Sequence, residues 1–312
     1  GWIEERRVEA ALRQRSFLRN ALEYGAVRLL LWTLAAGPKS LSLRLADFYT
    51  DLLDLAVPRL RRTALRNLEL AMPELSHRER TRIVEGVFAS IARLMVAFAR
   101  FPQIHRGNIG EWIRYEGYEH VENARNRGKG VLFATAHLGN WELSAFAYAI
   151  LSGPMHVVVR PLDNPYLDRL VSRYRTLSGN RLVEKKDFLR GILRALHDND
   201  AVGILVDQNA GLDDGVFIDF FGLKASANPG FAKLAAKSGA TVVPGFALWS
   251  ETEGRYVLRF DPPIEITGDA LADTQRIQAH IESVIRRYPD QWLWIHRRWK
   301  TRPPGEKPLY DR

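Results

Sequence analysis

Four nearly continuous apolar runs in the second half of the chain limit its possible folds most strongly. They read "GVLFATAH", "HVVVRP", "AVGILVDQ" and "ATVVPGFALW". Strands that are apolar on both faces are typical of a parallel sheet that is covered by helices on both sides. Helical patterns lie between the runs, near 141–151, 165–177, 187–198 and 228–238. This alternation predicts an α/β fold with a mostly parallel central sheet flanked by helices.

The rest of the chain adds helices on the N-terminal side and closes the sheet at the other end. "RYVLRFDPPIEI" predicts a strand near 255–266, and residues 270–288 predict a closing helix. Residues 1–105 show helical spacing of apolar side chains, interrupted at Pro58. Because no repeat or flexible linker separates these parts, we expect a helical region, 1–105, packed on an α/β core, 106–312.

Composition excludes some chemistry and points to an anionic partner. The chain has no cysteine, so a disulfide, a zinc-thiolate site and a thiol nucleophile are excluded. Its histidines show no metal-ligand spacing, and we expect no metal. Lys and Arg number 45 against 36 Asp and Glu, a net charge of +9. Such a surface favours nucleic acid, an acidic carrier protein or an anionic membrane.

The stretch "AVRLLLWTLAAG" (26–37) bears on membrane attachment. It contains Arg28 and is shorter than the about 20 residues that a membrane-spanning helix needs. Apolar side chains alternate with charged ones from 18 to 32, which predicts an amphipathic helix facing either a core or a membrane interface. We expect peripheral attachment. Anchoring by a segment upstream of Gly1 is the alternative, since the sequence does not begin with Met.

The stretch "AHLGNWEL" (136–143) holds the main catalytic candidate. His137 ends the first apolar run, and ligand crevices of α/β sheets lie at the carboxyl ends of the strands. Glu142 follows five residues later, a spacing that would not place both side chains on one face of a helix. His137 should therefore precede a helix that Asn140 caps, with Gly139 in the turn and Glu142 in the first helical turn. From there the carboxylate could fold back onto the imidazole.

Such a pair would make His137 a general base. A carboxylate on one ring nitrogen fixes the tautomer and frees the other nitrogen to take a proton. No serine lies in a G-x-S-x-G turn, so direct activation of a substrate hydroxyl is favoured over a serine hydrolase. The alternative is a purely structural role, which is the commoner fate of a single histidine at a strand end.

Further candidates lie near the same sheet edge. Asp207 ends the run "AVGILV" and is either a second carboxylate of the site or a structural cap. The amides of Gly139 and Asn140 are candidate donors to an oxyanion. "DFFG" (219–222) predicts a turn, and "SANPG" (226–230) predicts a helix start near Pro229.

The segment "WLWIHRRWKTRP" (292–303) concentrates aromatic and cationic side chains. A membrane interface suits this composition, because Trp prefers the headgroup level and cations attract anionic lipid. Base stacking in a nucleic-acid site is a second interpretation. Burial of the Trp rings in the core is the third.

Several of these blocks together resemble a known family. "HLGNWE" is similar to the H-x4-D/E motif of the glycerolipid-type acyltransferases. Six further blocks are similar to one branch of these enzymes, which contains the bacterial lipid A late acyltransferases and the phosphatidylinositol mannoside acyltransferases. In the order in which they occur, these blocks are "RNLELAMPELS", "VVVRPLDNP", "VDQNAG", "FIDFFGLKASANPGFAKLA", "TVVPGFAL" and "WLWIHRRWKTRP". The resemblance covers residues 66 to 303, most of the chain.

The resemblance implies a membrane-associated O-acyltransferase without a cofactor. His137 would be the base and Glu142 its orienting carboxylate. Arg160 and Arg175 would bind phosphates of the donor or the acceptor. The alternative interpretation is that each arginine forms a surface ion pair with Asp163 or Asp168. The donor would be acyl-CoA or acyl carrier protein, and the acceptor a bacterial glycolipid such as a lipid A precursor or a phosphatidylinositol mannoside. The enzyme would work at the cytoplasmic face of the inner membrane.

Two rival functions fit the same residues. In a lipid ester or thioester hydrolase, His137 and Glu142 would activate water, and free fatty acid would appear without an acceptor lipid. In a non-enzymatic basic membrane-binding protein, His137 would be structural, and its substitution by Ala would leave binding intact.

Overall fold

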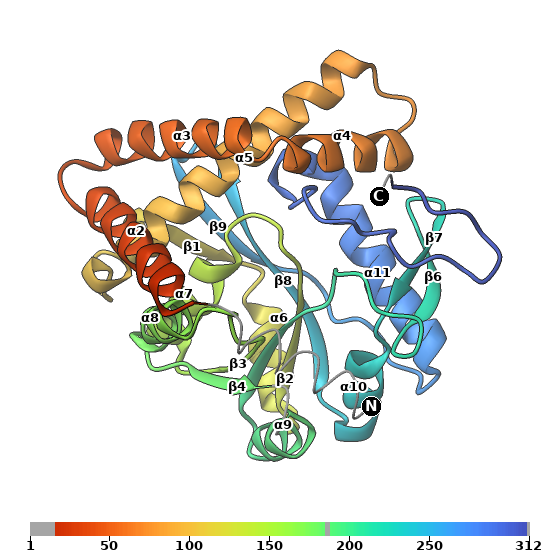
Figure 1. Ribbon diagram of the computed structural model, residues 1–312. Helices are drawn as coiled ribbons and strands as arrows, with labels where there is room; N and C mark the ends of the chain where they lie inside the picture. The colour runs from red at the N-terminus through yellow and green to blue at the C-terminus, as the bar shows by residue number, and fades with distance from the viewer. Residues whose placement is uncertain (1–15, 185–187, 311–312) are drawn as a thin grey trace.

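The computed structural model describes residues 16–184 and 188–310, and its centre is a seven-stranded sheet (Figure 1). The strand order is β1-β9-β8-β2-β5-β3-β4. The bounds are β1 Ile113–Glu116, β2 Val131–Thr135, β3 His156–Val159, β4 Arg181–Glu184, β5 Ala201–Leu205, β8 Thr241–Ser250 and β9 Arg255–Phe260. Neighbouring strands pair in parallel, except that β8 and β9 are antiparallel. The predicted α/β fold with a mostly parallel sheet is confirmed.

The four apolar runs form four of the five inner strands, and this places the carboxyl end of β2 at the centre of the sheet. β2 lies between β5 and β8, and Thr135 at its end is level with Leu205 of β5. β9 is shorter than expected: it ends at Phe260, where Pro262 and Pro263 interrupt the run of backbone N–H donors that a strand requires.

Helices cover both faces of the sheet. They are α6 Glu119–Asn126, α7 Trp141–Ser152, α8 Pro165–Thr176, α9 Phe188–His197, α10 Gly230–Ser238 and α11 Ala270–Arg287. Short 3-10 turns, η1 Phe101–Gln103, η2 Ile109–Glu111 and η3 Pro289–Gln291, join some of the elements. The five helices expected in this half of the chain are confirmed, with bounds that differ by at most two residues.

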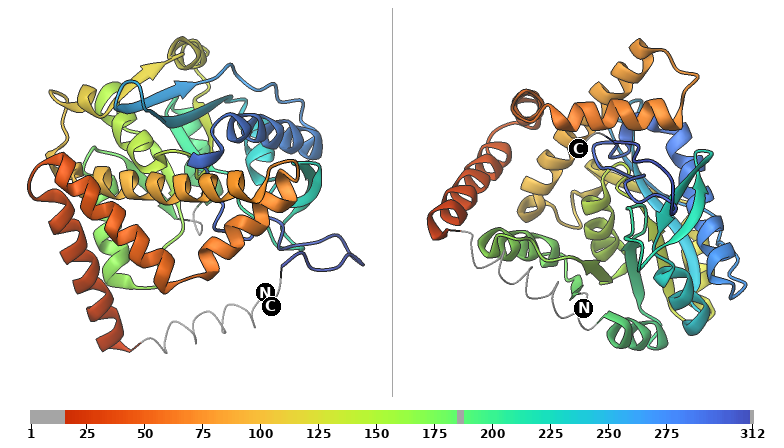
Figure 2. Two further views of the ribbon diagram at one scale, coloured as in Figure 1. Left: turned by 90° about the horizontal axis from the view of Figure 1, so that it is seen from above. Right: turned by 45° about the vertical axis from the view of Figure 1, so that its right-hand side comes forward.

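The N-terminal helices form a layer around one long helix. They are α2 Phe17–Ala35, α3 Lys39–Ala56, α4 Arg59–Ala71 and α5 His77–Ala99, and α5 contacts the other three (Figure 2). A capping box of Ser76 and Glu79 starts α5. Val87 of α5 joins the apolar cluster on one face of the sheet, and Val96 joins the cluster on the other. The described part of the helical region, from residue 16 on, therefore packs on the sheet, while residues 1–15 lie outside the described residues. The division at residue 105 stays a prediction.

A small hairpin packs beside α11. Its strands are β6 Val216–Phe220 and β7 Leu223–Ala227, and the "DFFG" turn joins them with Phe221 and Gly222 at positive φ. Glycine adopts this conformation without strain, and such two-residue turns fit the twist of a hairpin. The start of α10 directly after Pro229 confirms the predicted helix start.

No helix in the part of the chain that the structure describes is long and apolar enough to cross a membrane. The outer helices α2 and α3 nevertheless expose many large apolar side chains. They are Phe17, Leu18, Leu22, Leu29, Trp32, Leu41, Phe48, Leu52, Leu53 and Leu55. We call this set the N-terminal apolar face.

Candidate active site

The loop after β2 holds His137 in a fixed place. Asn140 caps α7 by accepting the N–H of Leu143, as predicted. Gly139 has a φ of +64°, and a Cβ at this position would lie 1.9 Å from the carbonyl oxygen of Ala247. Only glycine therefore fits between β2 and β8 here.

The backbone N–H groups of this loop have acceptors within the protein. The N–H of Gly139 donates to the carbonyl of Gln291, and the N–H of Asn140 donates to the carbonyl of Ala247. Neither residue lines the cavity next to His137. Both backbone N–H groups therefore hold the loop in place, and a substrate-binding role of Gly139 and Asn140 stays a prediction.

Asp207, rather than Glu142, is the carboxylate that contacts His137. Its Oδ1 lies 2.9 Å from Nδ1 of His137, and its Oδ2 accepts the backbone N–H of His137 at 2.9 Å. Oδ2 also accepts the indole N–H of Trp292 at 2.9 Å. The pairing follows from strand order, because β5, which leads into Asp207, lies directly beside β2. The strand-end position predicted for Asp207 is confirmed.

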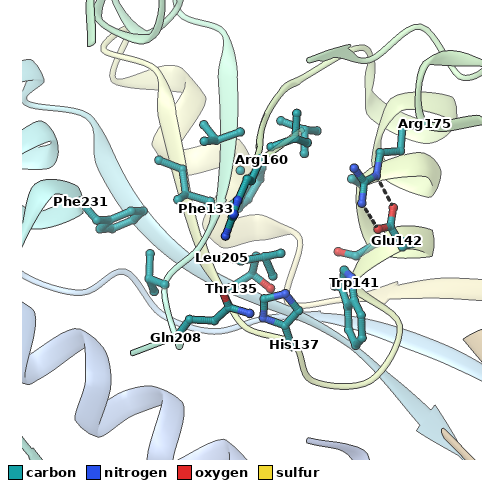
Figure 3. Close-up of a pocket in the computed structure, with 18 of the residues that line it drawn as sticks. Phe133, Thr135, His137, Trp141, Glu142, Arg160, Arg175, Leu205, Gln208 and Phe231 are labelled. Carbon is teal, nitrogen blue, oxygen red and sulfur yellow. Dashed lines mark hydrogen bonds and ion pairs between the residues drawn. The ribbon is translucent and has the colours of Figure 1, made fainter. Parts of the chain in front are cut away.

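Glu142 has another partner, so the expected hydrogen bond between the imidazole of His137 and the carboxylate of Glu142 is absent. Its two oxygens accept Nη2 of Arg175 at 2.6 Å and Nε of Arg175 at 3.0 Å (Figure 3). Glu142 lies in the first turn of α7, as predicted, and Arg175 in the last turn of the adjacent α8. The planar guanidinium matches both carboxylate oxygens, and this favours the pair over a turn of Glu142 back toward the imidazole.

Charges around the imidazole make it more basic than an ordinary histidine. Burial acts to lower the pKa of His137, but the attraction and hydrogen bond of Asp207 outweigh it, with help from the charge of Glu142. The pKa of His137 is therefore raised above its usual value of 6.5, although Arg175 opposes the shift. The ring lines a cavity, and its side chain remains 16% exposed.

Asp207 is ionised although it is fully buried. Burial alone would raise the pKa of this carboxyl, but the charge and hydrogen bond of His137, with the indole of Trp292, hold it well below its usual range. Arg298 is also fully buried, and burial lowers the pKa of its guanidinium to about 10. It donates to the carbonyl of Ser226 and to the side chain of Gln278.

A cavity of about 820 Å³ opens beside His137. Most of its wall is apolar, contributed by β2, β3, β5, β8, β9 and α7. The lining includes Phe133, Phe146, Tyr148, Met155, Val157, Gly203, Leu205, Gly245, Leu258 and Phe260. A glycine inside a strand is typical of a place where a ligand approaches closely, and both strand glycines lie in this wall.

The other end of the cavity is polar. Arg160, at the end of β3, projects into it from above His137 in Figure 3, and Arg175 lines it from the side. Arg160 makes no ion pair within residues 16–184 and 188–310. The alternative interpretation of Arg160, a surface ion pair with Asp163 or Asp168, is therefore not observed. Further polar lining residues are Asp163, Gln208, Asn209, Asp214 and Asn228.

The aromatic segment near the C-terminus is part of the core. Trp292, Trp294 and Trp299 are fully buried, as is Arg298 between them. The membrane-interface and base-stacking interpretations of these three rings are therefore wrong, and burial is right. The segment also supports the site, because Leu138 and Trp292 form a β-bridge and the N–H of Leu293 donates to the carbonyl of His137.

Sequence reasoning missed Trp292 as a partner of Asp207. The indole N–H of Trp292 is a hydrogen-bond donor in an aromatic segment, and a buried indole usually has an acceptor. The sequence does not show which residue that acceptor is. Among the described residues, no group of three or more His, Asp and Glu side chains is placed to hold a metal ion.

Comparisons with known proteins agree on one group of enzymes. Residues 12–301 match the family described as "Bacterial lipid A biosynthesis acyltransferase". The chain is 32% identical to the lipid A biosynthesis lauroyltransferase of Escherichia coli K12 over 78% of this chain and 80% of that protein. It is 28% identical to the lipid A biosynthesis myristoyltransferase of the same organism, over 81% and 79%. A lipid A biosynthesis acyltransferase of Haemophilus influenzae is 26% identical, over 80% and 79%.

Proposed function

The chain belongs to the bacterial lipid A biosynthesis acyltransferase family, and from this premise we propose that it transfers a fatty acyl chain from a thioester to a hydroxyl of a lipid A precursor. Membership makes the protein an acyltransferase. The observation that carries the proposal is the position of His137, a histidine of raised pKa at the junction of an apolar and a polar part of one cavity.

His137 would act as the general base. Its Nδ1 is occupied by Asp207, and Nε2 has no hydrogen-bond partner among the described residues. Nε2 would take the proton of the acceptor hydroxyl as the oxygen attacks the thioester carbonyl carbon. The C–S bond of the resulting oxyanion then breaks, and the leaving thiolate takes the proton from Nε2. The proton and the acyl group are thus both accounted for.

No acyl-enzyme is needed in this mechanism. The chain has no cysteine, and within the described residues no serine or threonine hydroxyl is hydrogen-bonded to His137. Donor and acceptor would therefore bind together. The apolar wall suits the acyl chain of the donor, because burial of each methylene contributes about 0.8 kcal/mol.

The polar end of the cavity suits phosphate groups. Arg160 has no competing ion pair in the described part of the chain, and Arg175 is held in position by Glu142. Guanidinium groups match phosphate geometry, and both acyl-CoA and the prosthetic group of acyl carrier protein contain phosphate. The net charge of +9 favours an acidic carrier in addition.

A lipid acceptor requires access to a membrane, and we propose peripheral attachment at the cytoplasmic face of the inner membrane through the N-terminal apolar face. Trp32 is 67% and Phe48 58% exposed, on α2 and α3 respectively. Amphipathic helices with such side chains lie in the interface between headgroups and acyl chains. The positive charge of the protein adds attraction to anionic lipid.

A transfer assay tests the proposed reaction. A labelled acyl thioester is incubated with the protein and a lipid A precursor, and labelled lipid is separated from free fatty acid. His137→Ala should lower transfer by about 10²-fold or more, the usual contribution of a general base. His197→Ala is the matched control, because that side chain is 88% exposed in α9. Release of free fatty acid at a rate independent of the acceptor would instead support the hydrolase.

Vesicle binding tests the attachment. Trp32→Glu and Phe48→Glu should each weaken co-sedimentation with phosphatidylglycerol vesicles roughly tenfold or more, because each removes a side chain whose burial contributes about 1.5–3 kcal/mol. Leu271→Glu, at an apolar position that is 51% exposed in the first turn of α11, is the control. Equal loss of binding in all three variants would show that added charge, rather than the N-terminal apolar face, governs attachment.

A further inference from the structure

The loop after β3 borders the polar end of the cavity and lies next to the start of α2. Residues 160–163 all line the cavity and are all exposed, so the cavity opens to the surface along them. We call these four residues the rim loop. Asn164 follows directly and begins α8, and α8 packs against α2 (Figures 1 and 2). One helix of the N-terminal apolar face is therefore attached beside the opening of the cavity.

The side chain of Asn164 joins the rim loop to α2. Its Oδ1 accepts the N–H groups of Tyr166 at 3.0 Å and Leu167 at 3.4 Å and thereby caps α8. Its Nδ2 donates to the backbone carbonyl of Asn20 at 3.0 Å and to Oε2 of Glu23 at 2.9 Å, both in α2. Asn164 is only 2% exposed. One buried amide group therefore holds two helices and the end of the rim loop together.

Further contacts fix both sides of this junction. The ring of Tyr166 lies 6.3 Å from the ring of Phe17 and 6.0 Å from the ring of Tyr24, centroid to centroid. Such aromatic pairs stabilise beyond the area they bury. Within the rim loop, the N–H of Leu162 donates to Oδ1 of Asp168 at 2.8 Å. The start of α2 and the rim loop therefore have a fixed position relative to each other.

The apolar surface of α2 continues across this junction to the cavity. Phe17 is 73% exposed and Leu162 is 43% exposed, and Leu162 also lines the cavity. Leu162 precedes Asn164 by two residues, which is at most about 7 Å of chain. Phe17 lies less than one helical turn before Asn20, to which Asn164 donates. We call the start of α2 together with the rim loop the α2–rim seam.

The charges of the α2–rim seam suit a lipid better than an acidic carrier protein. In the rim loop, Arg160 and Asp163 carry opposite charges. In α2, Arg19 forms an ion pair with Glu23 at 3.0 Å. An acidic carrier requires a surface of net positive charge, and these charges cancel. The acyl chains of a lipid instead gain from contact with exposed apolar side chains.

We propose that the α2–rim seam is the passage by which the acceptor lipid moves between the bilayer and the cavity, and that Asn164 keeps this passage aligned with the cavity. The inference rests on the proposed transfer to a lipid acceptor and on the proposed attachment. The bilayer contacts the rim loop as well as α2, so the headgroup reaches the polar end of the cavity while the acyl chains stay on apolar side chains. Asn164 is a positioning residue, because it does not itself line the cavity.

Contact of the rim loop with the bilayer can be measured without turnover. The chain has no cysteine, so a single introduced cysteine can be labelled specifically with a fluorophore. Phosphatidylglycerol vesicles with brominated acyl chains quench a fluorophore only where it touches those chains. We expect quenching at Leu162→Cys and at Leu29→Cys in α2. We expect none at Leu271→Cys in α11, a helix on the far side of the molecule from α2 (Figures 1 and 2).

The other patterns of quenching would overturn the passage. Quenching at Leu29→Cys without quenching at Leu162→Cys would leave the attachment standing and remove the passage. Quenching at none of the positions would refute the attachment and the passage together, and equal quenching at all three would show contact without a preferred face. Because the measurement involves no turnover, these results are distinct from a failure of the proposed acyl transfer.

Asn164→Asp tests the positioning role. The two side chains have the same shape, and the aspartate still caps α8. It cannot donate to the carbonyl of Asn20, and its charge repels Glu23. KM for the acceptor in vesicles should rise roughly tenfold, because two hydrogen bonds between α2 and the rim loop are lost. The kcat value should stay near wild type, as should KM for the same acceptor dispersed in detergent, which does not have to leave a bilayer.

A second substitution should restore the junction. In Asn164→Asp combined with Glu23→Gln, the amide of residue 23 can donate to the new carboxylate, and KM in vesicles should fall back toward the wild-type value. Glu23→Gln alone is the matched control, because it still offers an oxygen to Asn164. An unchanged KM in vesicles for Asn164→Asp would overturn the positioning role. A rise of equal size in vesicles and in detergent would do the same, since it would indicate a distorted cavity.

Discussion

Gly203→Ala should shorten the acyl chain that the protein accepts. Gly203 lies in the apolar wall of the cavity, in β5, level with Phe133 of β2. His137 follows Phe133 by four residues, which corresponds to about 13 Å of strand. The substitution therefore acts on the part of the cavity far from the reacting thioester and leaves the base untouched.

The size of the effect follows from the space around the added methyl group. A Cβ at Gly203 would lie 2.6 Å from Cε of Met155, too close for contact. Because that atom is the far end of a flexible side chain, Met155 should move rather than the backbone. The methyl group and the displaced thioether end together should exclude one or two methylenes. At about 0.8 kcal/mol each, kcat/KM for the longest accepted chain falls roughly 4- to 15-fold.

The assay is a competition among thioesters of increasing chain length, with the transferred chains quantified by mass spectrometry. Gly203→Ala should lower kcat/KM for the longest chains and leave the short ones unchanged. Gly191→Ala, on the exposed side of α9 with no atom within 4 Å of the added Cβ, is the control. An unchanged length profile, or an equal loss at all lengths, would refute the placement of the acyl chain.

Three further outcomes follow from the site and its supports. Since the base must be neutral and the pKa of His137 is raised, kcat/KM should increase with pH through a midpoint above 6.5, and Glu142→Gln, which removes a charge that raises this pKa, should move the midpoint of the pH–rate profile to lower pH. Arg175→Lys keeps the charge but loses the two-point contact with Glu142 and should reduce kcat/KM by about 10- to 100-fold in steady-state assays. Asn67 is fully buried and bonds the carbonyls of residues 294 and 296, so Asn67→Leu should lower the free energy of unfolding by about 2–4 kcal/mol in urea titrations without changing the pH–rate midpoint.

The strands β2, β3, β5 and β8 could be predicted from the sequence because burial on both faces leaves a continuous apolar run. The edge strands β1, "IRYE", and β4, "RLVE", could not, since each carries charged residues and only four positions. The hairpin strands β6 and β7 also escaped prediction, although the turn between them was identified. None of these short strands shows the strict apolar–polar alternation or the continuous apolar run by which a strand is recognised.

The residues of the site were found more readily than their partners. His137 and Asp207 each end an apolar run, so a shared sheet edge was predictable. The sequence did not show which strands are neighbours in the sheet, because β2 and β5 are separated in sequence by two strands and three helices. Glu142 was therefore assigned to His137 on sequence proximity, while the carboxylate that makes the contact comes from 70 residues away.

The burial of the aromatic-cationic segment 292–303 is a second feature that could not be predicted from the sequence. Alternating Trp and Arg residues are equally compatible with a membrane interface and with a core in which the N–H groups find acceptors. Arg298 is fully buried there because backbone and amide oxygens, Ser226 and Gln278, surround its guanidinium. Those acceptors come from distant parts of the chain, and composition does not reveal them.

The mass of the lipid product tests the central claim most directly. A purified lipid A precursor is incubated with an acyl thioester and either the wild-type protein or His137→Ala, and the intact lipid is weighed by mass spectrometry. The wild-type protein should add one acyl chain per molecule, with one free thiol released for each, and His137→Ala should add almost none. An unchanged lipid mass with the wild-type protein, or equal acylation by the His137 variant, would contradict the account.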